Sequence, residues 1–407
     1  MVSALGAPDL PPSLDIPTAA PKSGPAPTLS PAAGVPTSSI VSEATAAAIE
    51  NSVVKIFSTR RLPDLFKPWT KQAASDVTGT GIIIEGNRIL TNAHVVAYAS
   101  QVQVQANQSG TKISATVEAI APGIDLAILK LDDESLFDGR PPVPRANTLP
   151  DVKEPVMAYG YPTGGSNLSI TKGIVSRIEF AVYNGWTSGL RIQIDAAINA
   201  GNSGGPAVSG DKMIGLAFSR LGGAQNIGYI IPNEDVELFL ADVKDGRYDG
   251  KPAMFEGVQT LENPALRAYL KLEKTAQGIV VDEPLSAEAS YPLKKWDVIT
   301  KIGGTPVDDQ GMVKPPNGPR VRFNYLVQQR VKEGKVPLTV IRAGKETAVD
   351  LPVRTERPQV LGDLGGGYPS YFVFGPMVFT AATAQFLNGI DNNVATVNMF
   401  SAIGHPW

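Results

Sequence analysis

The sequence predicts an all-β protein, because short apolar segments with the pattern of strands recur between residue 53 and about residue 235. Gly, Asn and Pro mark the turns between these segments, and the strands do not alternate with long helical segments. Many short strands at such spacing are typical of a barrel or a sandwich. The segments are 53–57, 81–85, 102–105, 114–120, 156–159, 173–178, 191–194 and 213–218.

Residues 1–41 precede this region and are rich in Pro, Ala and Ser. Such a segment buries too little apolar surface to offset the entropy lost on ordering, so we expect a disordered tether. Ser42 and Glu43 then open a short helix, and the pattern predicts a closing helix at 234–242 after the strands.

Residues 251–354 read as a second, smaller unit of mixed structure. Its expected elements are a helix at 264–269, a strand at 278–281, an acid followed by a strand and a turn at 293–304, a helix at 323–331 and a strand at 336–342. Residues 355–407 follow as a third segment, which is too short to complete another such unit.

The composition excludes several classes of protein. The chain has 407 residues, a net charge of −3, two histidines and no cysteine. Disulfides, thiolate nucleophiles and cysteine-zinc sites are therefore excluded, and two distant histidines make a metal site and a metal cofactor unexpected. The charges are interspersed, so no nucleic-acid-binding face is predicted. No apolar run is long enough to span a membrane, and the first ten residues show no intact signal peptide.

Residues 200–206 place Ser203 on a glycine-rich bend, where little side-chain bulk blocks approach to its hydroxyl. The glycines also allow backbone N–H groups to converge on one point, where the oxygen of an attacked carbonyl would gain negative charge. The alternative is a tight turn between two strands, because Gly, Asn, Ser and Pro are ordinary turn residues.

Two further segments support the catalytic interpretation. His94 is the only credible imidazole base near neutral pH, because His405 lies next to the C-terminus. Asp125 stands just before a buried strand, where a carboxylate can orient an imidazole and stabilise its charged form. Taken singly, His94 would be a packed core histidine and Asp125 a carboxylate at a strand end.

The order His94, Asp125, Ser203 is the order of chymotrypsin. Residues 91–94, 125–127 and 201–205 resemble the HtrA/Deg serine proteases, with a pattern closest to the plant-type Deg proteases. The resemblance covers roughly residues 45 to 355. It implies a chymotrypsin-like double β-barrel over 42–250, followed by a PDZ domain over 251–354. An incomplete or degenerate second PDZ-like segment is implied over 355–407.

This resemblance implies an ATP-independent serine endopeptidase that cleaves unfolded or damaged proteins, without a cofactor. Ser203 would attack the scissile carbonyl, His94 would take its proton and Asp125 would hold the imidazole. The backbone N–H groups of Gly201, Asn202 and Ser203 would form the oxyanion hole. Two alternatives are a chaperone or PDZ scaffold with weak proteolysis, and another acyl-transfer hydrolase such as an esterase.

The specificity pocket implied by the resemblance is lined by small or apolar residues. They are Ala197, Ile198, Ala217, Phe218 and Ser219. Asp195 is the nearest acid, and the family pattern places it at a strand end outside the pocket. An apolar pocket favours cleavage after small aliphatic residues, because burying an unpaired charge is costly.

The PDZ resemblance implies that Phe255, Glu256, Gly257 and Val258 form a loop whose N–H groups bind the C-terminal carboxylate of a peptide. Glu256 carries the wrong charge for this role unless its side chain points away. In PDZ proteins a glycine usually stands where this chain has Trp296.

HtrA-like proteases assemble as trimers through an N-terminal segment with aromatic residues, so a homo-trimer or a multiple of trimers is expected. Phe66 and Trp69 lie in the matching region, and the alternative is that they cover the first barrel. The loop at 176–189, with Phe180, Tyr183 and Trp186, is expected to communicate with the PDZ domain. The sequence leaves the compartment open between the bacterial periplasm, plastids and other sites.

Overall fold

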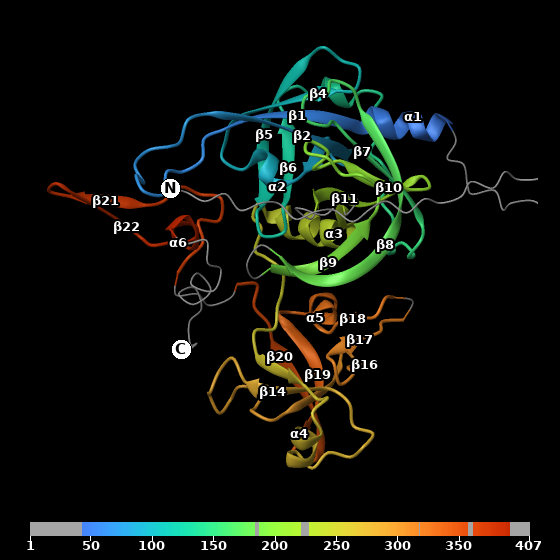
Figure 1. Cartoon of the computed structure of the whole chain (residues 1–407), viewed down its shortest axis with the longest axis vertical. Helices are drawn as coiled ribbons and strands as arrows, with labels where there is room; N and C mark the ends of the chain where they lie inside the picture. Colours follow the sequence, from blue (N-terminus) through green and yellow to red (C-terminus); the bar gives the residue numbers. More distant parts are fainter. Residues whose placement is uncertain (1–42, 184–186, 221–227, 317, 357–360, 391–407) are drawn as a thin grey trace, which may run out of the picture. The chain divides into compact units, whose positions relative to one another are not determined.

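The computed structural model describes residues 43–183, 187–220, 228–316, 318–356 and 361–390 (Figure 1). The tether expected at residues 1–41 lies outside the described residues, as does the end of the chain from residue 391. None of the helices in the described ranges is both long and apolar enough to cross a membrane.

The first six strands form a closed barrel in the order β1-β2-β3-β6-β5-β4. Its elements are β1 (Val53–Arg60), β2 (Ser75–Ile84), β3 (Arg88–Thr91), β4 (Ala99–Ala106), β5 (Lys112–Ala121) and β6 (Leu126–Leu131). Three short helices accompany them, namely α1 (Glu43–Ser52), α2 (Ala93–Val96) and η1 (Glu134–Phe137). Alternate residues of β1 point into the barrel, where Val54 and Ile56 pack against Val104 and Leu129.

The next six strands form a second closed barrel in the order β10-β11-β12-β9-β8-β7. Its elements are β7 (Pro155–Gly160), β8 (Ser169–Tyr183), β9 (Thr187–Ile194), β10 (Pro206–Ser209), β11 (Lys212–Arg220) and β12 (Gly228–Pro232). Helix α3 (Asn233–Asp242) and the short η2 (Val243–Asp245) follow it. The predicted all-β fold with a chymotrypsin-like pair of six-stranded barrels is confirmed.

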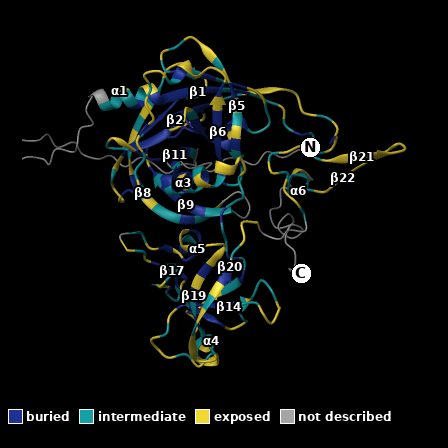
Figure 2. Ribbon diagram, turned by 180° about the vertical axis from the view of Figure 1, so that it is seen from behind, coloured by how far each residue is buried: buried dark blue, intermediate teal, exposed yellow. Residues whose placement is uncertain are grey.

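A shared core joins the two barrels. Leu90 and Ile128 of the first barrel belong to the same buried cluster as Leu216 and Ile231 of the second. Val236 and Phe239 of α3 complete this cluster, and both are fully buried. In Figure 2 the dark blue of buried residues gathers along β1, β2 and β11. Burial on this scale fixes the two barrels against each other, because the apolar surface between them is removed from water.

A third sheet follows the two barrels, and it is antiparallel, with the strand order β13-β14-β15-β19-β20 and with β16 paired to β15. Its elements are β13 (Gly257–Thr260), β14 (Ile279–Glu283), β15 (Val298–Ile302), β19 (Lys335–Arg342) and β20 (Lys345–Pro352), with α4 (Pro264–Tyr269) and α5 (Asn324–Arg330). The short strands are β16 (Thr305–Pro306), β17 (Met312–Val313) and β18 (Val321–Arg322). Trp296 has a φ of 74°, a left-handed conformation that favours glycine, and its ring lies against Tyr269.

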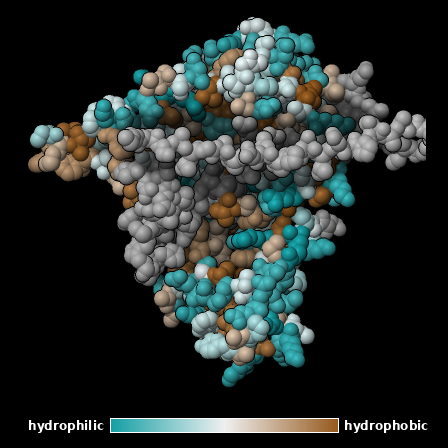
Figure 3. Space-filling view, viewed as in Figure 1, coloured by the Kyte–Doolittle hydropathy of each residue, from teal (hydrophilic) through white to brown (hydrophobic). Residues whose placement is uncertain are grey.

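The third segment forms an exposed hairpin, β21 (Tyr371–Phe374) and β22 (Met377–Thr380), followed by α6 (Ala384–Ile390). All eight hairpin residues are exposed, and Figure 3 shows apolar colouring on the hairpin. Phe66 is 63% exposed and its ring lies 5.5 Å from that of Phe386, while Trp69 lies near Tyr371. The two aromatic residues expected at a trimer contact therefore touch the C-terminal segment of their own chain.

Candidate active site

His94 and Asp125 form a closely bonded pair inside the first barrel. Strand β3 leads directly into the one-turn helix α2, which carries His94, and Asp125 stands one position before β6. The His94 Nδ1 lies 2.8 Å from Asp125 Oδ2, and the His94 backbone N–H donates to Oδ1 at 2.9 Å. Asp125 is 7% exposed, whereas the His94 side chain is nearly half exposed.

The surroundings of Asp125 fix the orientation of the imidazole. Asp125 has a φ of 60°, an uncommon conformation for a non-glycine residue that the neighbouring structure must hold in place. Asn92 contributes, because its Nδ2 donates to the Asp125 carbonyl at 2.9 Å. Because Asp125 Oδ2 accepts a hydrogen bond from the His94 Nδ1–H, we assign the proton of the neutral ring to Nδ1. Nε2 is then able to accept a proton.

Ser203 lies on the predicted bend between β9 and β10, which depends on glycine. Gly201 and Gly204 have φ values of 97° and 87°. A Cβ at Gly204 would overlap the Thr80 carbonyl, and one at Gly201 would overlap the Tyr161 carbonyl. These positions therefore need glycine both for conformation and for the close approach of neighbouring backbone.

Two threonines of the first barrel hold this bend. Sequence reasoning missed Thr80, and it included Thr91 only as part of the motif at residues 91–94. Thr80 Oγ1 donates to the Gly201 carbonyl at 2.7 Å, and the Thr80 backbone N–H donates to the Ser203 carbonyl at 2.9 Å. Thr91 Oγ1 in turn donates to the Thr80 carbonyl at 2.7 Å. Both threonines are 0% exposed. The signal of Thr80 in the sequence is weak, because a threonine between two glycines is also typical of an ordinary strand.

The Ser203 hydroxyl donates to the Phe218 carbonyl at 3.4 Å, longer than an ordinary O–H···O hydrogen bond. It makes no hydrogen bond to His94 in the described part of the chain. Proton transfer from Ser203 to His94 would therefore require a change in this geometry. Catalytic hydrogen bonds are often long or poorly aligned in enzymes without bound substrate.

The backbone hydrogen bonds of the bend distinguish Asn202 from the other two expected oxyanion donors. The Asn202 N–H is already used, because it donates to the Asn199 carbonyl at 3.0 Å. Within the described residues, the N–H groups of Gly201 and Ser203 have no such partner. The expectation for Asn202 is therefore corrected, since its N–H closes the turn that presents the other two.

The five residues expected in the specificity pocket fall into separate groups. Ile198 and Ala217 share the core cluster of the second barrel, and the Ile198 side chain lies against Gly228. Ala197 is half-buried, and its carbonyl accepts from Thr171 Oγ1 at 2.9 Å. The Phe218 ring packs instead against the cluster between the barrels. The Ser219 side chain lies outside the described residues.

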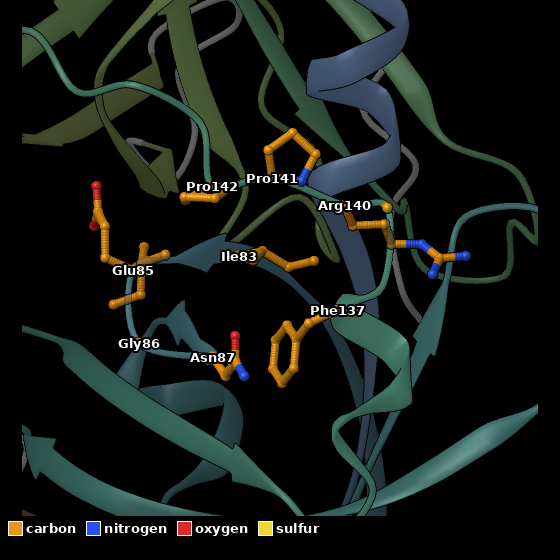
Figure 4. A pocket seen from close by; sticks show the side chains of 10 residues that line it. Ile83, Glu85, Gly86, Asn87, Phe137, Arg140, Pro141 and Pro142 are labelled. Carbon is orange, nitrogen blue, oxygen red and sulfur yellow. The ribbon is translucent and has the colours of Figure 1, made fainter.

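Asp195 is exposed, and one of its oxygens accepts the Ile174 N–H at 2.6 Å. This contact agrees with the strand-end role expected for it. A separate cavity of about 400 Å³ lies in the first barrel and is lined by Ile83, Phe137 and Pro141 among others (Figure 4). None of the three candidate catalytic residues lines it.

Glu256 lies just before β13, and its side chain is turned into the third sheet's domain. It is 8% exposed, and its carboxylate accepts a hydrogen bond from the Tyr291 hydroxyl. Burial raises the pKa of the Glu256 carboxyl above its ordinary value. Strand β13 is an edge strand of its sheet and could accept an added strand.

The expected loop at 176–189 is mostly a hairpin, because β8 extends to Tyr183 and β9 begins at Thr187. Phe180 is 8% exposed and shares a core cluster with Phe323 and Val321 of the third sheet's domain. Gln328 of α5 donates to the Ser188 carbonyl at 3.0 Å. Trp186 and the side chain of Tyr183 lie outside the described residues.

Comparisons with known proteins agree with the barrels. The model of the trypsin-like peptidase domain matches residues 79–216. Protease Do-like 4, mitochondrial, of Arabidopsis thaliana is 40% identical over 83% of this chain and 66% of its own length. Among solved structures, the HtrA-type protease AlgW with a decapeptide has a TM-score of 0.58 at 26% identity, over 77% of this chain and 98% of that chain.

The chain spans 55–66% of the length of Do-like proteases 4, 3 and 2 of Arabidopsis thaliana. Putative protease Do-like 13 of the same plant is 35% identical over 85% of this chain, and the match covers 72% of that protein. On this similarity along most of both chains, the protein belongs to the family of Do-like proteases, the HtrA/Deg group that its motifs resemble.

Proposed function

We propose that this protein is an ATP-independent serine endopeptidase that cleaves unfolded or damaged proteins in protein quality control. The observation that carries the proposal is the His94–Asp125 pair, whose two contacts at 2.8 and 2.9 Å orient a half-exposed imidazole. The glycine bend with Ser203 is bonded to the same barrel through Thr80. Such an arrangement suits nucleophilic attack on an acyl group.

In the proposed reaction, Ser203 Oγ attacks the scissile carbonyl while His94 Nε2 accepts its proton. Asp125 stays ionised and stabilises the imidazolium that forms. The N–H groups of Gly201 and Ser203 bind the negative oxygen, and each such donor lowers the barrier by about 3 kcal/mol. His94 then protonates the leaving amine, and water releases the acyl group from Ser203.

The substrate is proposed to place a small aliphatic side chain near Ile198 and Ala217. Both residues are apolar and buried, and Asp195, the acid nearest to them in the sequence, accepts the backbone N–H of Ile174 instead. Val, Ala or Ile before the scissile bond fits this surface. Because such side chains are buried in native proteins, unfolded chains would be the preferred substrates.

We further propose that 251–354 is a PDZ domain, preceded by a protease domain at 42–250 and followed by a partial second PDZ-like segment at 355–407. A peptide would add to the free edge of β13, beside residues 255–258. The inward turn of Glu256 supports this role, because its carboxylate is bonded to Tyr291. The resemblance supports a homo-trimer, or a multiple of trimers.

The location proposed is an organelle or a bacterial periplasm. Relatives named mitochondrial and chloroplastic support the former, and HtrA-type neighbours in structure are consistent with the latter.

A chaperone or PDZ scaffold with weak proteolysis is the second candidate. It is favoured by the Ser203 hydroxyl, which is bonded to Phe218 rather than to His94. Casein digestion and fluorophosphonate labelling, each on the wild type and on Ser203→Ala, separate the two. The protease proposal requires both activities in the wild type and neither in the variant. Binding of unfolded casein without digestion by the wild type would favour the chaperone.

A further inference from the structure

Three charged side chains are buried together next to the candidate active site. Arg191 of β9 is 3% exposed, Asp235 of α3 is 4% exposed, and Lys251 beyond η2 is 8% exposed. Arg191 Nη1 lies 3.1 Å from Asp235 Oδ2, and Lys251 Nζ lies 2.7 Å from the other carboxylate oxygen. A buried charge is costly unless it is paired, so neither cation can move away without leaving Asp235 partly uncompensated.

Arg191 also contacts the residue that accepts the Ser203 hydroxyl. Its guanidinium carbon lies 4.8 Å from the centre of the Phe218 ring, within the range of a cation–π contact. The carbonyl of that same Phe218 lies 3.4 Å from Ser203 Oγ. A planar guanidinium can stack on a ring and bond a carboxylate at once, which an ammonium cannot do equally well.

The strand ladder holds Phe218 less regularly than its two neighbours. The pairing of β11 with β12 shifts register between Ala217, which pairs with Ile230, and Ser219, which pairs with Tyr229. Phe218 is the extra residue of this irregularity, so its backbone lacks a regular partner on β12. The ring contact with Arg191 is therefore an additional constraint on the position of Phe218.

Lys251 connects this cluster to the third sheet. The N–H of the nearby Ala253 donates to the Arg354 carbonyl at 2.8 Å, just beyond the end of β20. The segment that carries Lys251 is thus bonded at one end to Asp235 and at the other to the neighbouring domain. Lys251 thereby links the third sheet to Asp235, and through Asp235 to Arg191.

We propose that Arg191 is a positioning residue of the protease, which holds the Phe218 carbonyl for the backbone N–H of the substrate residue before the scissile bond. We also assign Lys251 a share in this role, because it fixes Asp235 from the side of the third sheet. This inference rests on the proposed function, since it needs a substrate acylating Ser203. Neither residue touches the reacting atoms.

The test uses full-length Arg191→Met, Arg191→Lys and Lys251→Met with two matched peptides. One peptide carries a free N–H on the residue before the scissile bond, and the other is N-methylated there. The matched control is Arg145→Met, because Arg145 also bridges two acids, Glu85 and Glu237, without contacting Phe218. Rates are normalised to the sites titrated by a fluorophosphonate, so loss of folded enzyme does not enter the comparison.

We expect the wild type to prefer the N–H peptide by about tenfold in kcat/KM, the value of one good hydrogen bond. Arg191→Met should reduce this preference to about twofold, Arg191→Lys should restore part of it, and Lys251→Met should weaken it in the same direction. Arg145→Met should keep the full preference. An unchanged preference in Arg191→Met would show that Arg191 is only structural and would overturn the inference. A wild type that the fluorophosphonate does not label would instead overturn the proposed function itself.

Discussion

Replacing Thr80 by Val should weaken both the fold and the active-site bend. Thr80 Oγ1 donates to the Gly201 carbonyl at 2.7 Å and accepts the Tyr161 N–H at 2.9 Å, and the residue is fully buried. Valine has nearly the same shape and leaves both backbone groups without this partner. Each such group costs about 1–3 kcal/mol, so the free energy of unfolding should fall by about 2–6 kcal/mol.

A control for this substitution stands on the same strand. Thr78 of β2 has a buried Oγ1 that finds no hydrogen-bond partner within the described residues. Thr78→Val should therefore leave stability unchanged or raise it, because it removes a buried unsatisfied hydroxyl.

Thermal unfolding followed by circular dichroism compares the two variants. A loss of about 2 kcal/mol corresponds to a fall of several degrees in Tm for domains of this size. Peptidase rates per titrated site should also fall in Thr80→Val, since Gly201 is one end of the proposed oxyanion hole. Equal melting curves and equal rates for Thr80→Val and Thr78→Val would refute the bonding of the bend to the first barrel.

Three further predictions concern the proposed chemistry. Asp125→Asn should lower kcat by about 10⁴-fold with little change in KM, because the amide no longer holds the required tautomer of His94; rates within tenfold of wild type would argue against the pair. Peptides with Val or Ala before the scissile bond should be cut faster than matched peptides with Lys or Asp, and a measured preference for Lys would place another acid in the pocket. Because the pKa of Glu256 is raised in the folded state, its protonated form stabilises the fold at pH values below the ordinary Glu pKa. This contribution to stability is lost as the pH rises through the pKa of the folded state. Glu256→Gln should therefore raise Tm relative to wild type more at pH 7 than at pH 4, and an equal difference at both would contradict the burial of an ionisable group.

The local motifs of the sequence were sufficient to predict the class of fold and to single out the candidate catalytic residues, of which the structure brings His94 and Asp125 into contact. His94, Asp125 and Ser203 each stand beside a strand or glycine bend whose pattern is visible within a few residues. The presence of β1 and β2 was likewise visible, because β1 has an alternating burial pattern and β2 ends in three isoleucines. The predicted segment 81–85 captures only the buried end of β2, since the polar residues from Ser75 onward carry no such alternation.

Contacts between distant segments could not be predicted in this way. Thr80 meets Gly201, and Lys251 meets Asp235 and through it Arg191, only after both barrels have closed. The segment 176–189 was expected to be a loop, yet its residues continue β8 and open β9, because Phe180 gains a core shared with the third sheet's domain. The left-handed backbone conformation of Trp296 could not be predicted either, because the neighbouring structure imposes it on a residue type that does not favour it.

The most direct test of the central claim is to find which residue an irreversible, serine-directed inhibitor modifies. The wild-type chain would be treated with a fluorophosphonate, digested and analysed by mass spectrometry. The proposed chemistry predicts one adduct, on Ser203, that disappears in Ser203→Ala and forms far more slowly in His94→Ala. An adduct on another residue, or casein hydrolysis that survives Ser203→Ala, would contradict the assignment of Ser203 as the nucleophile.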